Sequence, residues 1–322
     1  MIEVSGLTKC YGDKRAVDNI SFTVNRGEIL GFLGPNGAGK STTMNMLTGY
    51  ISSTSGVAKI DGFDILENPT EAKKRIGYLP EHPPLYLDMT VISYLEFVYQ
   101  LKRVDLPMKE HLDMVCEKVK ISHVKNRIIK NLSKGYRQRV GFAQALIGNP
   151  EVLILDEPTV GLDPKQIIDI RNLIKSLGED HTVILSSHIL PEIQATCDRI
   201  IIINQGNIVA DDTADNLSKN MSEDFRYTAR IEGDAEKTKE ILENVPNMVE
   251  VIHLGEKEEG VSDFMLEANP ETDIRRDLFD AVVSGGLRLL GLKSNEMTLE
   301  DIFLQLTSKD IKITEETEGE TE

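Results

Sequence analysis

The residues best suited to chemistry form a glycine-rich stretch near the N-terminus, Gly34–Thr42. It fits the pattern G-x-x-x-x-G-K-[ST], in which a tightly bent backbone turns successive N–H groups toward phosphate oxygens. The helix expected after the loop adds its positive dipole end to the same anion. Lys40 can reach the β- and γ-phosphates, and the Ser41 hydroxyl can ligate Mg²⁺. The stretch predicts a nucleoside triphosphate site made of Gly34, Pro35, Asn36, Gly37, Ala38, Gly39, Lys40, Ser41 and Thr42.

A pair of carboxylates, Asp156 and Glu157, follows the apolar run Val152–Leu155. Such a run predicts a central strand, and ligands of open α/β sheets bind at the carboxyl ends of the strands. Asp156 is suited to hold Mg²⁺, directly or through water. Glu157 is suited to polarise an attacking water, because the metal engages its neighbour and leaves it free. Beside the phosphate loop, the pair predicts hydrolysis of the bound triphosphate.

The elements that must position these residues alternate between strands and helices. Glu28–Leu33 predicts a strand before the loop and residues 41–50 a helix after it, and further strands and helices follow Glu157. Such alternation predicts a mainly parallel sheet covered on both faces. Antiparallel strands are expected before the loop, and helical spacing predicts an insertion at about 82–148. Residues 1–220 are therefore expected to form an α/β domain with an antiparallel β subdomain and a helical insertion.

A composition shift near Asp211 predicts a second, smaller domain. Residues 221–308 read as strand, helix, two strands, helix and strand, the order of a ferredoxin-like α+β unit. Thr298 is expected to cap one more helix. Residues 1–210 carry 24 Lys and Arg and 24 Asp and Glu, so the net charge of −17 falls on the remainder, with 12 and 29. This acidity argues against nucleic acid or an anionic membrane as its partner, and residues 309–322 are expected to be a disordered acidic tail.

Cysteine usage and hydropathy bear on the compartment. Cys10, Cys116 and Cys197 are isolated thiols without metal-ligand spacing, which favours a reducing environment. The chain does not start with a signal-peptide pattern, and no apolar run approaches the roughly 18 residues that cross a bilayer. These features predict a cytoplasmic protein.

Together these motifs resemble the nucleotide-binding subunit of ABC transporters, over essentially all of residues 1–220. The resemblance implies that the ligands are ATP and Mg²⁺. It implies that Tyr11 stacks on adenine and that Asp163 lies in a loop linking two ATP sites. His188, after the strand-like run Ile184–Ser187, resembles the histidine that contacts the γ-phosphate in this family.

The stretch Leu132–Gln138, LSKGYRQ, stands where the family has its signature LSGGQ. Ser133 and the Gly135 N–H lie at a predicted helix N-terminus, which suits an anion. The resemblance implies that these two residues bind the γ-phosphate held by a second copy of the chain. Each ATP would then be shared, and two copies would close head-to-tail around two nucleotides.

Two departures from the family pattern stand out. Lys134 and Tyr136 replace Gly and Gln of the commonest signature, but Ser133 and Gly135 are kept, so a working site is expected. Glu81 stands where the family usually has glutamine, in the loop that senses Mg²⁺. It is a candidate catalytic and metal-binding residue whose role as direct ligand, holder of a water, or neither is open.

The sequences LSKGYRQR and YLPE, with one nucleotide domain and an added C-terminal unit, resemble the ABC-2-type export branch of multidrug, sodium and gliding-motility-like exporters. This implies an ATP-hydrolysing subunit on the inner face of the cell membrane. A separate permease would dock near Glu81 and residues 90–119. The alternative is a soluble ABC ATPase acting on a ribosome or DNA. One nucleotide domain, without a long coiled-coil insertion or a basic patch, argues against it.

Overall fold

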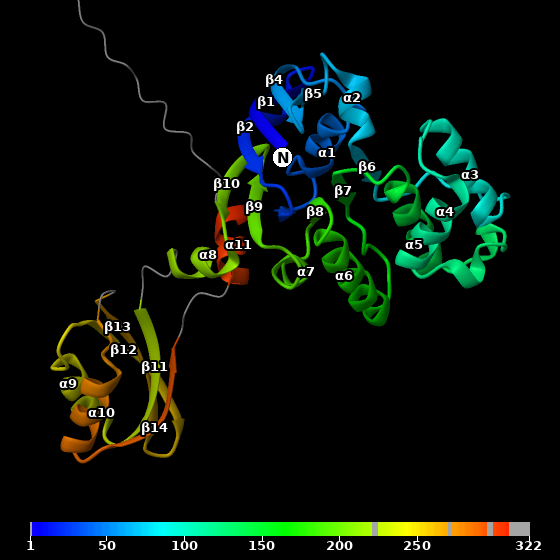
Figure 1. Ribbon diagram of the computed structural model, residues 1–322. Helices are drawn as coiled ribbons and strands as arrows, with labels where there is room; N and C mark the ends of the chain where they lie inside the picture. Colours follow the sequence, from blue (N-terminus) through cyan, green and yellow to red (C-terminus); the bar gives the residue numbers. More distant parts are fainter. Residues whose placement is uncertain (1, 221–224, 270–271, 295–298, 309–322) are drawn as a thin grey trace, which may run out of the picture. The chain divides into compact units, whose positions relative to one another are not determined.

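The computed structural model describes residues 2–220, 225–269, 272–294 and 299–308 (Figure 1). They form two compact units. The first contains the chain up to Ala214 and from Leu306 onward, and the second contains Asp215–Gln305. The predicted acidic tail, residues 309–322, lies outside the described residues.

The first unit is built on a six-stranded sheet with the order β10-β9-β3-β8-β7-β6. Every pair is parallel except β9 with β10, which confirms the predicted mainly parallel sheet. All residues of β3, β7 and β8 are buried, as their continuous apolar runs require. The strands are β3 (Ile29–Leu33), β6 (Ile76–Leu79), β7 (Val152–Asp156), β8 (Thr182–Ser187), β9 (Arg199–Asn204) and β10 (Asn207–Asp212).

A second, antiparallel sheet has the order β2-β1-β4-β5. Its strands are β1 (Ile2–Tyr11), β2 (Lys14–Val24), β4 (Ser55–Ile60) and β5 (Phe63–Asp64). One buried core joins this sheet to the parallel sheet, with Leu7 and Phe22 on one side and Ile154 and Ile201 on the other. Met44 of helix α1 (Lys40–Leu47) belongs to the same core, so the helix after the phosphate loop is held by both sheets.

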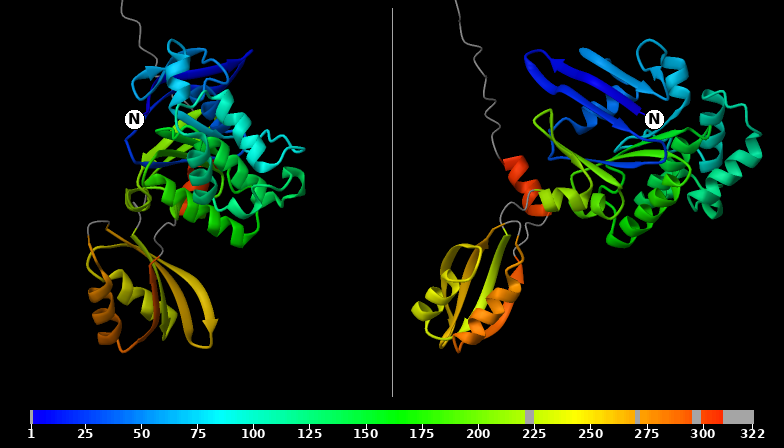
Figure 2. Two further views of the ribbon diagram at one scale, coloured as in Figure 1. Left: turned by 45° about the vertical axis from the view of Figure 1, so that its right-hand side comes forward. Right: turned by 60° about the vertical axis from the view of Figure 1, so that its left-hand side comes forward.

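The helical insertion carries α3 (Val91–Leu101), α4 (Met108–Lys118) and α5 (Lys134–Leu146), beside the edge strand β6 (Figures 1 and 2). Short 3₁₀ turns at Ser122–Val124 and Ile129–Asn131 connect α4 to α5. Ser133 caps α5 by accepting a hydrogen bond from the Tyr136 N–H, as the sequence predicts. The other helices of the first unit are α2 (Pro69–Lys74), α6 (Pro164–Gly178) and α7 (Leu190–Gln194), and α8 (Ala214–Asn220) begins at the residue where the first unit ends.

The second unit has the predicted order of strands and helices: β11 (Phe225–Glu232), α9 (Ala235–Glu243), β12 (Met248–Glu258), β13 (Val261–Ala268), α10 (Arg275–Ser284) and β14 (Arg288–Ser294). Its sheet, β12-β13-β11-β14, is antiparallel throughout, which is the ferredoxin-like arrangement. Both helices cover one face, where Leu242 and Val282 pack on Phe264 and its neighbours (Figure 2). A last helix, α11, spans Leu299–Ser308. Its predicted cap, Thr298, lies outside the described residues.

Candidate nucleotide site

The phosphate loop runs between β3 and α1, and its glycines are required by close backbone approach. A Cβ on Gly34 would lie 2.4 Å from the carbonyl oxygen of Ile203, at the end of β9. A Cβ on Gly39 would lie 2.6 Å from the carbonyl oxygen of Ala16, and Gly39 has φ 111°. Gly37 also has a positive φ, 82°. The neighbouring strands therefore demand glycine at both fixed positions of the pattern.

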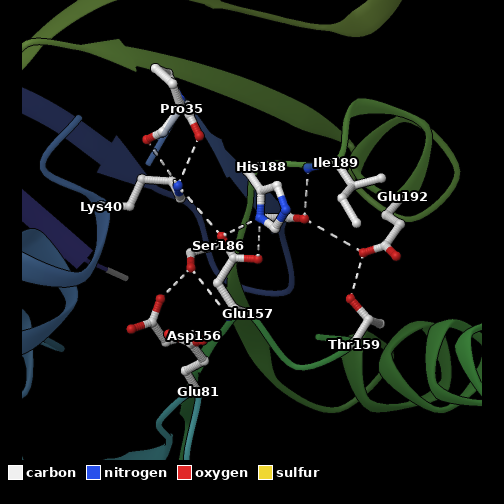
Figure 3. Close-up of polar contacts among 12 residues, drawn as sticks. Pro35, Lys40, Glu81, Asp156, Glu157, Thr159, Ser186, His188, Ile189 and Glu192 are labelled. Atoms are coloured by element: carbon white, nitrogen blue, oxygen red, sulfur yellow. Dashed lines mark hydrogen bonds and ion pairs between the residues drawn. The ribbon is translucent and has the colours of Figure 1, made fainter. Parts of the chain in front are cut away.

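Lys40 is the buried cation of the site, with 6% of its surface exposed. Its ammonium donates hydrogen bonds to the carbonyl oxygens of Gly34 at 2.8 Å and Pro35 at 3.3 Å. It also lies 3.4 Å from Oε1 of Glu157 (Figure 3). The phosphate loop and the strand-end carboxylate thus share one positive charge.

Asp156 lies at the end of β7 and is 3% exposed. Its Oδ1 is 3.4 Å from the Ser41 hydroxyl and accepts a short hydrogen bond from the Ser186 hydroxyl. Burial raises the pKa of the Asp156 carboxyl, as do the carboxylates of Glu157 and Glu81 to a smaller degree, while both hydroxyls act in the opposite direction. A cation at this carboxylate would favour its ionised form.

This pair of oxygen ligands fits Mg²⁺. Protein sites for Mg²⁺ commonly use one or two side chains and leave the other positions to waters and substrate phosphates. The hydroxyl of Ser41 and the carboxylate of Asp156 meet that description. In the part of the chain that the structure describes, no group of three or more His, Cys, Asp or Glu residues forms a metal cage.

Glu157 faces His188. His188 Nδ1 lies 3.0 Å and 2.9 Å from the two carboxylate oxygens, and Glu157 is 6% exposed (Figure 3). The Glu157 N–H donates to the carbonyl oxygen of Ser186 at 3.2 Å, and its φ is 48°. Non-glycine residues with positive φ are uncommon and recur at functional sites. The loops after β7 and β8 therefore bring the predicted catalytic pair together.

One cleft of about 460 Å³ collects most of the predicted site. Tyr11, which is 52% exposed, lines it, and the Lys9 ammonium lies 5.2 Å from the centroid of the Tyr11 ring. Lys14 also lines it, a residue that sequence reasoning missed although it lies three positions after Tyr11. The predicted residues that line this cleft are Tyr11, Asn36, Gly37, Gly39, Lys40, Ser41, Thr42, Glu81, Glu157 and His188. Gly34, Pro35, Ala38 and Asp156 are not among the residues that line this cleft, and Ala38 is buried.

Glu81 follows β6 at the border of this cleft. Its side chain is 42% exposed, and its Oε1 lies 3.7 Å from Nδ1 of His82. The Glu81 charge contributes to raising the pKa of Asp156. Glu81 also lines an adjoining cavity of about 850 Å³, together with Ser41 and Asp156. Its role as a direct metal ligand, as the holder of a metal-bound water, or as neither stays a prediction.

The predicted residues Ser133, Gly135 and Asp163 line a different cavity of about 410 Å³. Asp163 accepts a hydrogen bond from the Gln166 N–H at 2.9 Å and caps α6. A Cβ on Gly135 would lie 2.7 Å from Oε1 of Gln166, so the signature helix and α6 approach closely here. Within one chain, the signature and the phosphate loop line separate cavities.

A parallel sheet that carries a phosphate loop after β3 and paired carboxylates after β7 is the architecture of P-loop nucleoside triphosphatases. The Asp-Glu pair, with a histidine at the end of the neighbouring strand, suits hydrolysis of the terminal phosphate.

Comparison with known proteins places the chain within that class. Residues 17–160 match the family model "ABC transporter". The chain is 35% identical to the bacitracin transport ATP-binding protein BcrA of Bacillus licheniformis, over 95% of this chain and 97% of that protein. It is 32% identical to the linearmycin resistance ATP-binding protein LnrL of Bacillus subtilis, over 97% and 100%.

Among solved structures, a dimeric post-hydrolysis state of the ATP-binding cassette MJ0796, bound to ADP and Pi, superposes with a TM-score of 0.60. It is 26% identical and covers 66% of this chain and 98% of its own. The chain belongs to the ATP-binding subunits of ABC transporters, and its larger unit is an ABC ATPase domain that binds ATP. None of the helices in the described ranges combines the length and apolar character that a membrane crossing requires.

Proposed function

We propose that the chain hydrolyses ATP as a head-to-tail dimer that encloses two Mg²⁺-ATP and drives a separate permease. The separation of the predicted site into two cavities carries this proposal. Lys40 and Glu157 line one cavity, and Ser133 and Gly135 line another. Each nucleotide would lie between the first cavity of one copy and the second cavity of its partner.

The residues around Lys40 have distinct tasks in this proposal. Lys40 exchanges its contact with Glu157 for phosphate oxygens, which leaves the Glu157 carboxylate free to accept a proton from the attacking water. His188 keeps Nδ1 on Glu157, so Nε2 is the ring nitrogen that faces the γ-phosphate. Ser41 and Asp156 would hold Mg²⁺, which would supply positive charge against the phosphates when bound. Cleavage of the terminal phosphoanhydride then removes the group that Ser133 of the other copy binds, and the dimer relaxes.

Exposed apolar residues within the helical insertion support permease docking. Tyr86 is 54% exposed, Leu87 46% and Leu101 69%, and the Tyr86 ring packs on Phe97 at 5.4 Å between centroids. Such surfaces commonly mark sites where a partner helix binds. The 850 Å³ cavity lined by Glu81 is also lined by Pro84, two residues before Tyr86. Docking here would hold the chain peripherally on the inner face of the cell membrane.

The names of the relatives support export through the ABC-2-type branch. Bacitracin transport and linearmycin resistance are both consistent with outward movement of a toxic compound. They do not favour the alternative of an ABC ATPase that acts on a ribosome or DNA.

The dimer is tested by sedimentation velocity of the Glu157→Gln variant saturated with Mg²⁺-ATP. We expect a dimer with trapped nucleotide, because the substitution removes the proton acceptor but not the binding groups. Adding Ser133→Arg should return it to a single copy that still binds ATP. The control is Glu179→Gln, at an exposed position after α6. A catalytically inactive protein that stays a single copy would exclude the shared site.

A further inference from the structure

Glu192 of α7 is a buried carboxylate with unusual partners. It is 6% exposed, and its Oε2 accepts a hydrogen bond from the Thr159 hydroxyl at 2.5 Å (Figure 3). The same oxygen accepts a second hydrogen bond from the Ser187 hydroxyl at 3.5 Å. No cationic side chain pairs with it in the described part of the chain. Removing either hydroxyl would leave a buried oxygen of Glu192 with one hydrogen-bond donor fewer.

The two hydroxyls lie next to the predicted catalytic residues Glu157 and His188, one in the loop after β7 and one at the last residue of β8. Thr159 follows Glu157 by two residues, and Ser187 directly precedes His188. The Ser187 hydroxyl also accepts a hydrogen bond from the Ile189 N–H at 3.0 Å, which holds the backbone on both sides of His188. All three side chains are buried. One oxygen of Glu192 therefore joins the loop after β7 to the end of β8.

We propose that Glu192 is a positioning residue for hydrolysis, which holds these two loops in the register that sets His188 Nδ1 against the Glu157 carboxylate. This inference rests on the proposed function, because it assigns a role within that reaction. Glu192 contacts neither the cleft residue Lys40 nor the phosphate loop. Its loss should therefore lower kcat and leave the KM for ATP nearly unchanged.

The size of the effect follows from the geometry. The distance of 2.9–3.0 Å between His188 and Glu157 depends on two segments that are joined by the Glu157 N–H to the Ser186 carbonyl oxygen and, beyond these residues, by the side chain of Glu192. Displacing a catalytic group by about 1 Å costs on the order of 10²-fold in rate, so removal of the Glu192 side chain should lower kcat roughly 10- to 100-fold.

A matched pair of threonines gives the test. Thr159→Val removes the hydroxyl that donates to Glu192 at nearly constant volume. Thr196→Val makes the same change at a hydroxyl that is buried and has no hydrogen-bond partner in the described part of the chain. We expect kcat to fall roughly 10-fold in Thr159→Val, with KM for ATP within about twofold, and to stay unchanged in Thr196→Val. Equal kcat in the two variants would overturn the proposal.

Glu192→Leu and Glu192→Gln supply a second, independent measurement. Glutamine keeps an oxygen that accepts both hydroxyl hydrogen bonds, so it should retain most of kcat, whereas leucine should not. Thr159→Val combined with Glu192→Leu should be no slower than Glu192→Leu alone, because both changes break one contact. Additive losses, or losses explained by a smaller folded fraction in circular dichroism, would overturn the role. If Glu192→Leu does not fold, Thr159→Val decides. A wild type without ATPase activity would instead contradict the proposed function.

Discussion

Replacing Lys40 by methionine should destabilise the nucleotide-free protein through Glu157. The Lys40 ammonium and Glu157 Oε1 are 3.4 Å apart, and their side chains are 6% and 7% exposed. At this separation the attraction is about 5 kcal/mol for an effective dielectric constant of about 20. Removing one partner of a buried pair typically costs about 3–5 kcal/mol. Because His188 still faces the Glu157 carboxylate, we expect the lower end, about 3 kcal/mol of unfolding free energy.

The same reasoning predicts that adding Glu157→Gln restores part of the stability that Lys40→Met removes. With Glu157→Gln added to Lys40→Met, no uncompensated charge remains, and about 2 kcal/mol of stability should return as coupling between the two sites. The assay is urea unfolding followed by circular dichroism, with the transitions of the two units fitted separately. Additive effects of the single substitutions, with a coupling below about 0.5 kcal/mol, would refute the shared positive charge.

Three further predictions concern other parts of the site. Burial holds the pKa of Asp156 above its unfolded value of 3.8, so the stability of the wild type falls as the pH rises from 3.8 through the raised pKa. In the absence of Mg²⁺, the Asp156→Asn variant should therefore have a higher thermal unfolding midpoint than the wild type at pH 7. This difference between the two midpoints should vanish near pH 3, where Asp156 is protonated in both states. Gly34→Ala would force a Cβ against the Ile203 carbonyl oxygen; we expect a loss of roughly 1–3 kcal/mol in urea unfolding, together with weaker ATP binding in equilibrium dialysis. Leu101→Glu, on an exposed face of α3, should keep the ATPase rate of the isolated subunit but abolish its co-purification with a membrane protein; retained co-purification would contradict docking at this surface.

Local patterns made the core of the site predictable. The glycines at Gly34 and Gly39 reflect backbone approach that any loop of this kind requires, so their spacing is visible without a structure. The apolar run before Asp156 is a continuous central strand, and such a run is easily recognised in sequence. The second unit was predictable for a similar reason, since its strands and helices follow one another with short connections.

Features that depend on distant contacts were not predictable in the same way. Glu192 looks like an ordinary helical carboxylate in sequence, and its partner Thr159 is 33 residues away. The Ser186 hydroxyl donates a hydrogen bond to Asp156 only because β8 lies beside β7. Strand β10 was missed because Asn207–Asp212 is polar at both ends and pairs only at the sheet edge.

The placement of Ser133 and Glu157 in separate cavities has a consequence for mixtures of inactive proteins. One preparation would carry Ser133→Arg and the other Glu157→Gln, and neither would turn over alone. In a dimer of one copy of each variant, one nucleotide site would contain both substitutions. The other site would contain the unchanged Glu157 of one copy and the unchanged Ser133 of the other. Fully wild-type sites would form only in mixed pairs, one in each pair, so two inactive variants would restore ATPase activity when they are mixed.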